Sequence, residues 1–259
     1  MGRLHVVVEG DGADVVLLHG WGMSGRVWSS IVQRLAGRYR LTVVDLPGHG
    51  RSPVPPGSEL SRWLEMLFAV TPARAVWVGW SLGGMLALAA AAADAGRVEG
   101  VATVASNLRF VATDGWPEAV SPVLFDDVVE GIVEDPVKTL QRFVALQFLG
   151  VRTEAAAALS RRLRDEIAAA PPSAGALLPG LDLLRAIDNR ELASTLDLPV
   201  QMIFGGRDKL VPVAAREAIS ALAPRAETVL LDAAGHAPFL THPEAFLAVL
   251  QPFLERHAG

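Results

Sequence analysis

One short motif constrains this chain more than any other feature: a G-x-S-x-G sequence at residues 79–83, with Ser81 at its centre. The apolar run before it (75–78) is typical of a buried strand, and the Ala- and Leu-rich run after it (85–93) favours a helix. A serine on such a sharp turn projects its hydroxyl away from the backbone, and the flanking glycines remove side chains that would clash. The first N–H groups of the helix favour a negative charge developing beside the serine. We therefore interpret Ser81 as a nucleophile rather than as part of a structural turn.

Short apolar runs recur along the chain and alternate with runs that favour helices. The apolar runs predict strands at residues 4–9, 15–18, 41–45, 75–78, 98–104, 200–204 and 227–231. Helix-like runs occur at 26–35, 59–69, 85–93, 213–222 and 243–256. Alternation of this kind indicates an α/β fold, in which helices flank a mostly parallel sheet.

The alternation stops in the middle of the chain, where no strong strand pattern occurs from about residue 108 to 196. This stretch instead contains helix-like runs at 120–134, 136–149, 153–170 and 177–186. We expect it to form a helical cap inserted into the sheet domain. The predicted organisation is a first part of the core at 1–107, the cap at 108–196, and the second part of the core at 197–259.

Two further side chains complete a catalytic set with the serine. A serine hydroxyl is a poor nucleophile at neutral pH, and it needs a base that an acid holds in place. His236 follows the last predicted strand, and Asp208 follows the strand at 200–204. Loops at the carboxyl ends of parallel strands meet at one edge of the sheet, so both residues should lie near Ser81. Asp232 is the rival acid, because it ends its own strand close to His236.

A negatively charged intermediate also needs two backbone N–H donors. We expect one from Leu82, directly after the nucleophile, and one from Trp21, in the glycine-rich loop that ends the strand at 15–18. In contrast, we interpret His19 as a packing and hydrogen-bonding residue. Asp45 is interpreted as a buried carboxylate that accepts hydrogen bonds from loop N–H groups.

Composition excludes several classes of function. The chain has 259 residues and no cysteine, which excludes disulfides, thiolate metal sites and a cysteine nucleophile. No apolar run reaches about 18 residues, and the net charge of −5 argues against general nucleic-acid binding. The first residues do not have the pattern of a signal peptide. We expect a cytoplasmic monomer without a membrane span, a metal or another cofactor.

These residues together resemble the α/β-hydrolase superfamily, in which the triad follows the order serine, acid, histidine. Within it, the chain is similar to the pimeloyl-[acyl-carrier protein] methyl ester esterases of biotin synthesis. The similar segments are residues 18–22, 44–48, 79–84, 101–106, 142–147 and 236–239. The most specific are the tryptophan before the serine and the Arg-Phe-x-Ala-Leu-Gln sequence in the cap. The rest of the cap and the region 200–232 match loosely.

The resemblance implies an activity and its partners. A serine carboxylesterase of this kind hydrolyses the methyl ester of pimeloyl-[acyl-carrier protein] through an acyl-enzyme and releases methanol. Ser81, Asp208 and His236 would form the triad, and the N–H groups of Trp21 and Leu82 would bind the substrate oxyanion. The substrate channel would be lined by Phe143, Val144, Ala145, Leu146 and Gln147, with Phe143 and Leu146 as apolar walls and Gln147 as a polar end. The partners would be the carrier protein and small esters.

A run of basic residues in the predicted cap suggests where a carrier could dock. Residues 138–164 contain only one acid, Glu154, and six basic residues: Lys138, Arg142, Arg152, Arg161, Arg162 and Arg164. A solvated helical face is the ordinary interpretation of such a run. The functional interpretation is a surface that steers an acidic carrier protein toward the channel.

Other functions remain open on the sequence alone. A general short-chain carboxylesterase, a carbon–carbon bond hydrolase or a menaquinone-pathway lyase could use the same triad. A dehalogenase is disfavoured, because it uses an aspartate nucleophile and position 81 is serine. A non-catalytic ligand receptor on the same fold is a third class, since a fold and a motif do not establish a function.

Overall fold

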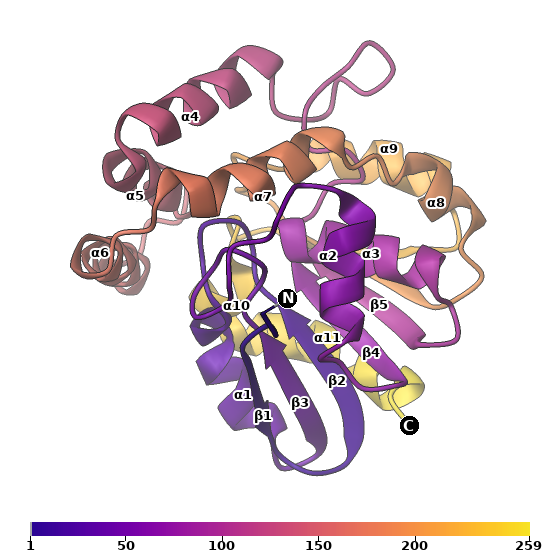
Figure 1. Ribbon diagram of the computed structural model, residues 1–259. Coiled ribbons are helices and arrows are strands. Elements are labelled where there is room, and N and C mark those ends of the chain that lie inside the picture. The colour runs from indigo at the N-terminus through magenta and orange to yellow at the C-terminus, as the bar shows by residue number, and fades with distance from the viewer. Residues whose placement is uncertain (1) are drawn as a thin grey trace.

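The computed structural model describes residues 2–259, and a seven-stranded sheet forms its core (Figure 1). The strands are β1 (Val6–Glu9), β2 (Ala13–Leu18), β3 (Tyr39–Val44), β4 (Ala75–Trp80), β5 (Val98–Val104), β6 (Val200–Gly205) and β7 (Glu227–Leu231). Their order in the sheet is β1-β3-β2-β4-β5-β6-β7. Every neighbouring pair is parallel except β1 with β3. The predicted α/β fold with a mostly parallel sheet is confirmed.

Helices cover both faces of the sheet, so its central strand is buried on both sides. All six residues of β4 are buried, and successive side chains point to opposite faces. Trp77 packs on one face with α2 (Leu60–Phe68), α3 (Leu82–Ala93) and α9 (Val213–Leu222). Val78 packs on the other face with the 3₁₀ helix η1 (Gly25–Trp28), α1 (Ser29–Leu35) and α11 (Pro243–His257). The single helix predicted at residues 26–35 is in fact η1 followed directly by α1. The short helix α10 (Pro238–Thr241) was not predicted.

Four helices between β5 and β6 form a layer above the carboxyl ends of the strands (Figure 1). They are α4 (Pro122–Glu134), α5 (Pro136–Gln147), α6 (Glu154–Ala169) and α7 (Ala174–Ala186). Each begins after a side chain that caps its free N–H groups: Ser121, Asp135, Thr153 and Ser173. A fifth helix, α8 (Arg190–Thr195), was not predicted and packs against α3 and α9 of the core. We propose the division at residues 108 and 196 as the cap boundaries.

An ionic cluster joins the two ends of this insertion. Arg109 and Asp188 pair as an isolated antiparallel bridge, and the guanidinium of Arg109 donates to the Asp188 carboxylate at 2.9 Å. Arg190 donates to both oxygens of the same carboxylate, at 2.8 and 2.7 Å. Hydrogen bonds from Arg190, and then from Arg109, lower the pKa of Asp188 to about 2. The chain therefore leaves the core and returns to it at one ionic contact.

No helix among the described residues combines the length and the apolar character that crossing a membrane requires.

Candidate active site

Ser81 lies at a sharp turn between β4 and α3, in a backbone conformation that residues other than glycine rarely adopt. Its φ is 53° and its ψ is −117°. The turn is possible because residues 79 and 83 are glycines. A Cβ on Gly79 would lie 2.2 Å from the Gly83 carbonyl oxygen, and a Cβ on Gly83 would lie 2.5 Å from the Leu18 carbonyl oxygen. The local sequence thus places Ser81 at the N-terminus of α3, as the motif predicts.

A serine shortly after the neighbouring strand β5 supports this turn. The Ser106 hydroxyl donates to the Ser81 carbonyl oxygen at 2.8 Å, and it lies directly after Ala105, whose φ is 46°. From the sequence, position 106 was considered only as a place for the acid of the triad, and it carries no carboxylate. The signal available in the sequence was a small polar residue shortly after the last strand before the cap.

His236 and Asp208 form a buried pair, and each side chain is 1% exposed. His236 Nδ1 lies 2.8 Å from Asp208 Oδ2, while Asp208 Oδ1 accepts hydrogen bonds from the N–H groups of Leu210 and Val211. Because the ionised carboxylate only accepts, His236 carries its proton on Nδ1. Its Nε2 is buried and has no partner in the described chain. The rival Asp232 is exposed, so the structure pairs the histidine with Asp208.

Trp80, directly before Ser81, links the turn at Ser81 to the loop that carries His236. The Trp80 indole N–H donates to the His236 carbonyl oxygen at 2.7 Å, and the two rings are 5.7 Å apart. On the other side, the His236 N–H donates to the carbonyl oxygen of Gln147, at the end of α5. His236 is therefore held by its neighbours from both the core and the cap.

The two predicted oxyanion donors lie close to Ser81: Leu82 begins α3, and Trp21 is in the loop after β2. A Cβ on Gly20 would lie 3.3 Å from the Ser81 Cβ, so the loop after β2 runs beside the serine. Within the described chain, the N–H groups of Trp21 and Leu82 donate to no protein acceptor. Two free amides beside a serine at a helix N-terminus are the arrangement that stabilises an oxyanion.

His19 controls the direction of one of these amides. Its Nδ1 lies 2.7 Å from the Gly20 carbonyl oxygen, and its Nε2 accepts a hydrogen bond from the Leu46 N–H at 2.9 Å. The Gly20 carbonyl and the Trp21 N–H belong to one peptide group and point in opposite directions. Fixing the carbonyl therefore fixes the N–H. Burial, and then the nearby His49, lower the pKa of His19 to about 3, so the imidazole stays neutral at neutral pH.

Replacing His19 by alanine is expected to lower kcat for a small ester by about 10- to 100-fold, because the Trp21 amide loses its fixed direction. KM should change by less than about threefold, since the donor acts mainly on the transition state. His19→Asn should recover part of kcat, because its side-chain amide can donate to the Gly20 carbonyl. Steady-state kinetics on p-nitrophenyl butyrate provide the measurement. A rise in KM at unchanged kcat would contradict this role.

Helix α5 divides the predicted channel residues between its two faces. Phe143, Val144 and Gln147 are buried, whereas Ala145 and Leu146 are exposed. The Phe143 ring meets the Trp21 indole edge-on, with centroids 4.9 Å apart. Five consecutive residues of a helix cannot all face one cavity. The structure thus brings Phe143 and Gln147 to the site and leaves Leu146, 39% exposed, on the outer face.

A contact with the cap that the sequence did not predict holds the loop after β2, which carries Trp21. The Trp21 indole N–H donates to the Leu177 carbonyl oxygen of α7 at 2.9 Å. A Cβ on Gly180 would lie 2.7 Å from Trp21, so that glycine allows α7 to approach the ring. Asp45, in turn, accepts from the N–H groups of Gly25 and Arg51, as predicted for a structural carboxylate.

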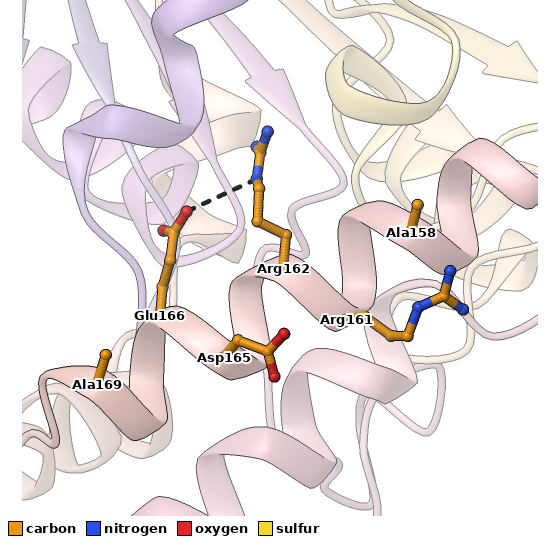
Figure 2. Close-up of a pocket in the computed structure, with 6 residues that line it drawn as sticks. All are labelled: Ala158, Arg161, Arg162, Asp165, Glu166 and Ala169. Atoms are coloured by element: carbon orange, nitrogen blue, oxygen red, sulfur yellow. Dashed lines mark ion pairs between the residues drawn. The ribbon is translucent and has the colours of Figure 1, made fainter.

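The six basic residues predicted as a docking face are distributed over α5, the loop after it and α6. Arg152, Arg161 and Arg164 line one groove. Arg161 also lines a second pocket with Arg162, which forms an ion pair with Glu166 at 3.6 Å (Figure 2). Lys138 and Arg142 are exposed on α5. Among the described residues, no cluster of three or more His, Asp or Glu side chains could hold a metal ion.

The parallel sheet, the serine turn after its central strand and the buried His–Asp pair after its last strands are features of the α/β hydrolases. The sequence profile of the family described as alpha/beta hydrolase fold matches residues 15–243. An esterase of known structure from Exiguobacterium antarcticum superposes with a TM-score of 0.87 at 21% identity, covering 98% of this chain and all of its own. At that identity the likeness concerns the fold.

Curated relatives indicate a narrower family within the α/β hydrolases. A protein from Edwardsiella ictaluri is 42% identical over 243 residues, which is 93% of each chain, and one from Stenotrophomonas maltophilia is 42% identical over 97% of this chain and 96% of its own. Both are named pimeloyl-[acyl-carrier protein] methyl ester esterase. This chain belongs to the α/β hydrolase family and, within it, to the family of these esterases. It is a carboxylic ester hydrolase.

Proposed function

We propose that this protein hydrolyses the methyl ester of pimeloyl-[acyl-carrier protein] in biotin synthesis, with Ser81, His236 and Asp208 as its triad. The observation that carries the proposal is the buried pair of His236 and Asp208, which leaves Nε2 without a protein partner beside the serine turn. The substrate is supported by the curated relatives of that name, which match nearly the whole chain. Cytoplasmic location and a monomeric state are part of the same proposal.

The first half of the reaction transfers the acyl group to the serine. Ser81 Oγ attacks the ester carbonyl carbon while His236 Nε2 takes the hydroxyl proton. The carbonyl oxygen becomes an oxyanion that accepts hydrogen bonds from the N–H groups of Trp21 and Leu82. The intermediate then collapses, the bond from carbon to the methoxy oxygen breaks, and His236 returns its proton to the leaving group, which departs as methanol.

The second half releases the acid. Water attacks the acyl-enzyme while His236 Nε2 takes one of its protons, and the same amides hold the second oxyanion. The bond to Ser81 Oγ breaks, and the serine regains its proton from His236. Asp208 accepts from Nδ1–H throughout, so it stabilises the imidazolium of each step and keeps Nε2 directed to the reacting atoms.

The buried face of α5 indicates which of its residues line the proposed substrate channel. Phe143 contributes an apolar wall beside Trp21, and Gln147, whose Oε1 is buried without a partner in the described chain, contributes a polar group. Val144 supports this inner face. Ala145 and Leu146 lie on the opposite face of the helix.

Methanol release from pimeloyl-[acyl-carrier protein] methyl ester tests the proposal directly. We expect the wild type to hydrolyse it with a kcat/KM at least about 10-fold above that for p-nitrophenyl butyrate, because remote binding energy aids only the cognate substrate. Ser81→Ala should lose both activities. Turnover of the small ester alone would favour a general carboxylesterase, and turnover of neither would favour a receptor.

A further inference from the structure

Trp80 is completely buried at the carboxyl end of β4, directly before Ser81. The tryptophan at this position is also among the residues most specific to the similarity with the esterases of biotin synthesis. No step of the reaction described above uses its side chain. Its contacts nevertheless reach the loop that carries the base and the loop that carries one of the two oxyanion donors.

The first contact holds the backbone of the base. The Trp80 indole N–H donates to the His236 carbonyl oxygen at 2.7 Å, and no other group of the described chain donates to this buried carbonyl. The His236 N–H donates to the Gln147 carbonyl oxygen of the cap at 3.3 Å. Trp80 therefore provides the shorter of these two backbone anchors, and the one that comes from the core. Asp208 orients the imidazole ring, whereas Trp80 fixes the backbone from which that ring extends.

The second contact supports the loop after β2. A Cβ on Gly20 would lie 3.2 Å from Cε3 and 3.3 Å from Cδ2 of the Trp80 indole. The loop thus lies directly against the indole ring. The Gly20 carbonyl and the Trp21 N–H belong to one peptide group, so the position of Gly20 also sets the position of this oxyanion donor. A smaller ring at position 80 would leave a gap next to that peptide.

Two further aromatic rings keep the indole in one orientation. The Phe239 ring meets the Trp80 ring edge-on, with centroids 5.2 Å apart, and it stacks on Trp28 with centroids 4.1 Å apart. All three side chains are completely buried. A close-packed ring of this kind has little freedom to turn. Its N–H therefore points in a fixed direction, as a group that positions a catalytic loop requires.

We propose that Trp80 is a positioning residue of the reaction: its N–H places His236 against Ser81, and its ring holds the loop that carries the Trp21 amide. The inference rests on the proposed function, because it needs Ser81 and His236 as nucleophile and base. Proton transfer requires the two groups within about 2.6–3.2 Å of each other. A displacement of about 1 Å can lower the rate by about 10²-fold. One side chain thus keeps the base and an oxyanion donor aligned with the nucleophile.

A second tryptophan of the same strand provides a matched control. Trp77 is also completely buried, but it packs on the opposite face of the sheet, edge-on to Phe68 at 5.9 Å. Its indole N–H has no partner in the described chain. Trp77→Phe and Trp80→Phe therefore remove the same atoms from one strand. A loss of core packing would follow from both substitutions, and a loss of catalytic positioning only from Trp80→Phe.

Trp80→Phe is expected to lower kcat for p-nitrophenyl butyrate by about 100-fold. KM should change by less than about threefold, since the positioned groups act mainly on the transition state. Trp77→Phe should keep kcat within about twofold of the wild type, although thermal unfolding should show that both variants are less stable. An unchanged kcat in Trp80→Phe, or equal losses of kcat in the two variants, would overturn the proposal.

Replacement of the N–H alone tests the hydrogen bond to His236 without loss of the ring. Benzothienylalanine at position 80 keeps a bicyclic ring of similar shape but has sulfur in place of the N–H. It should lower kcat by about 10-fold at nearly unchanged KM, because the buried His236 carbonyl loses its donor. 5-Fluorotryptophan at the same position keeps the N–H and should stay within about twofold of the wild type. Equal kcat values for the two proteins would overturn the role of the hydrogen bond, even if Trp80→Phe did not fold.

Ser81→Ala separates this inference from the proposed function. Activity retained in Ser81→Ala would overturn the proposed triad and this inference together. An inactive Ser81→Ala with normal kcat in both the Trp80→Phe and the benzothienylalanine proteins would overturn this inference alone. The small ester reports only on the triad and the oxyanion donors. A different natural substrate would therefore overturn the proposed function and leave the result for Trp80 standing.

Discussion

Asp208→Asn is expected to lower kcat for ester hydrolysis by roughly 10³-fold or more while the protein stays folded. Asp208 Oδ1 accepts from the N–H groups of Leu210 and Val211 at 2.8 and 3.0 Å. In the variant, these two donors hold the amide oxygen, so the amide NH₂ faces His236 Nδ1. The imidazole must then accept at Nδ1 and carry its proton on Nε2, where it can no longer take the proton of Ser81.

The matched control is Asp232→Asn. Asp232 is exposed and follows β7 a few residues before the histidine, so its loss should leave kcat within about twofold of the wild type. Ser81→Ala and His236→Ala should be at least as inactive as Asp208→Asn. Measured kcat on p-nitrophenyl butyrate, with circular dichroism to verify folding, provides the comparison. Near-normal turnover in Asp208→Asn together with loss in Asp232→Asn would show that the acid assignment is wrong.

The second large effect concerns the structure of the serine turn. Gly83→Ala is expected to destabilise the protein by about 3–5 kcal/mol, since the added carbon meets backbone rather than a flexible side chain. That Cβ would lie 2.5 Å from the Leu18 carbonyl oxygen and 2.6 Å from the His19 carbonyl oxygen. Relief of the clash would require α3 to move away from β2 and would also displace the loop after β2, which carries Trp21. Urea unfolding and the yield of folded protein measure the effect.

Gly175→Ala is the matched control for this prediction. Gly175 lies in the first turn of α7 and is exposed, and a Cβ added there would meet no atom within 4 Å beyond its own turn of the helix. The same added carbon should there stabilise the protein by about 0.5–1 kcal/mol, because alanine favours the helix over glycine. Gly83→Ala would contradict the steric argument if its free energy of unfolding stayed within about 1 kcal/mol of the wild type.

The amino-acid sequence by itself determined the strands, helices and turns that depend on residues close together in the chain. The alternation of apolar runs predicted all seven strands, and glycines at 79 and 83 predicted the sharp turn that carries Ser81. Helix caps such as Ser173 explain where cap helices begin, although α7 starts three residues before the predicted run. Short elements such as α8 and α10 were missed, because so few residues show little periodicity.

The tertiary structure decided the features that join residues far apart in the chain. The Trp80 indole meets the His236 carbonyl, and the Trp21 indole meets the Leu177 carbonyl, each across 156 residues. No local pattern encodes such pairs, because they depend on how β strands and cap helices pack. The same packing brings Arg207 of the core and Arg152 of the cap to the lining of one groove. Spacing along the sequence could predict basic residues in a cap, but only the packed chain shows which of them share a surface.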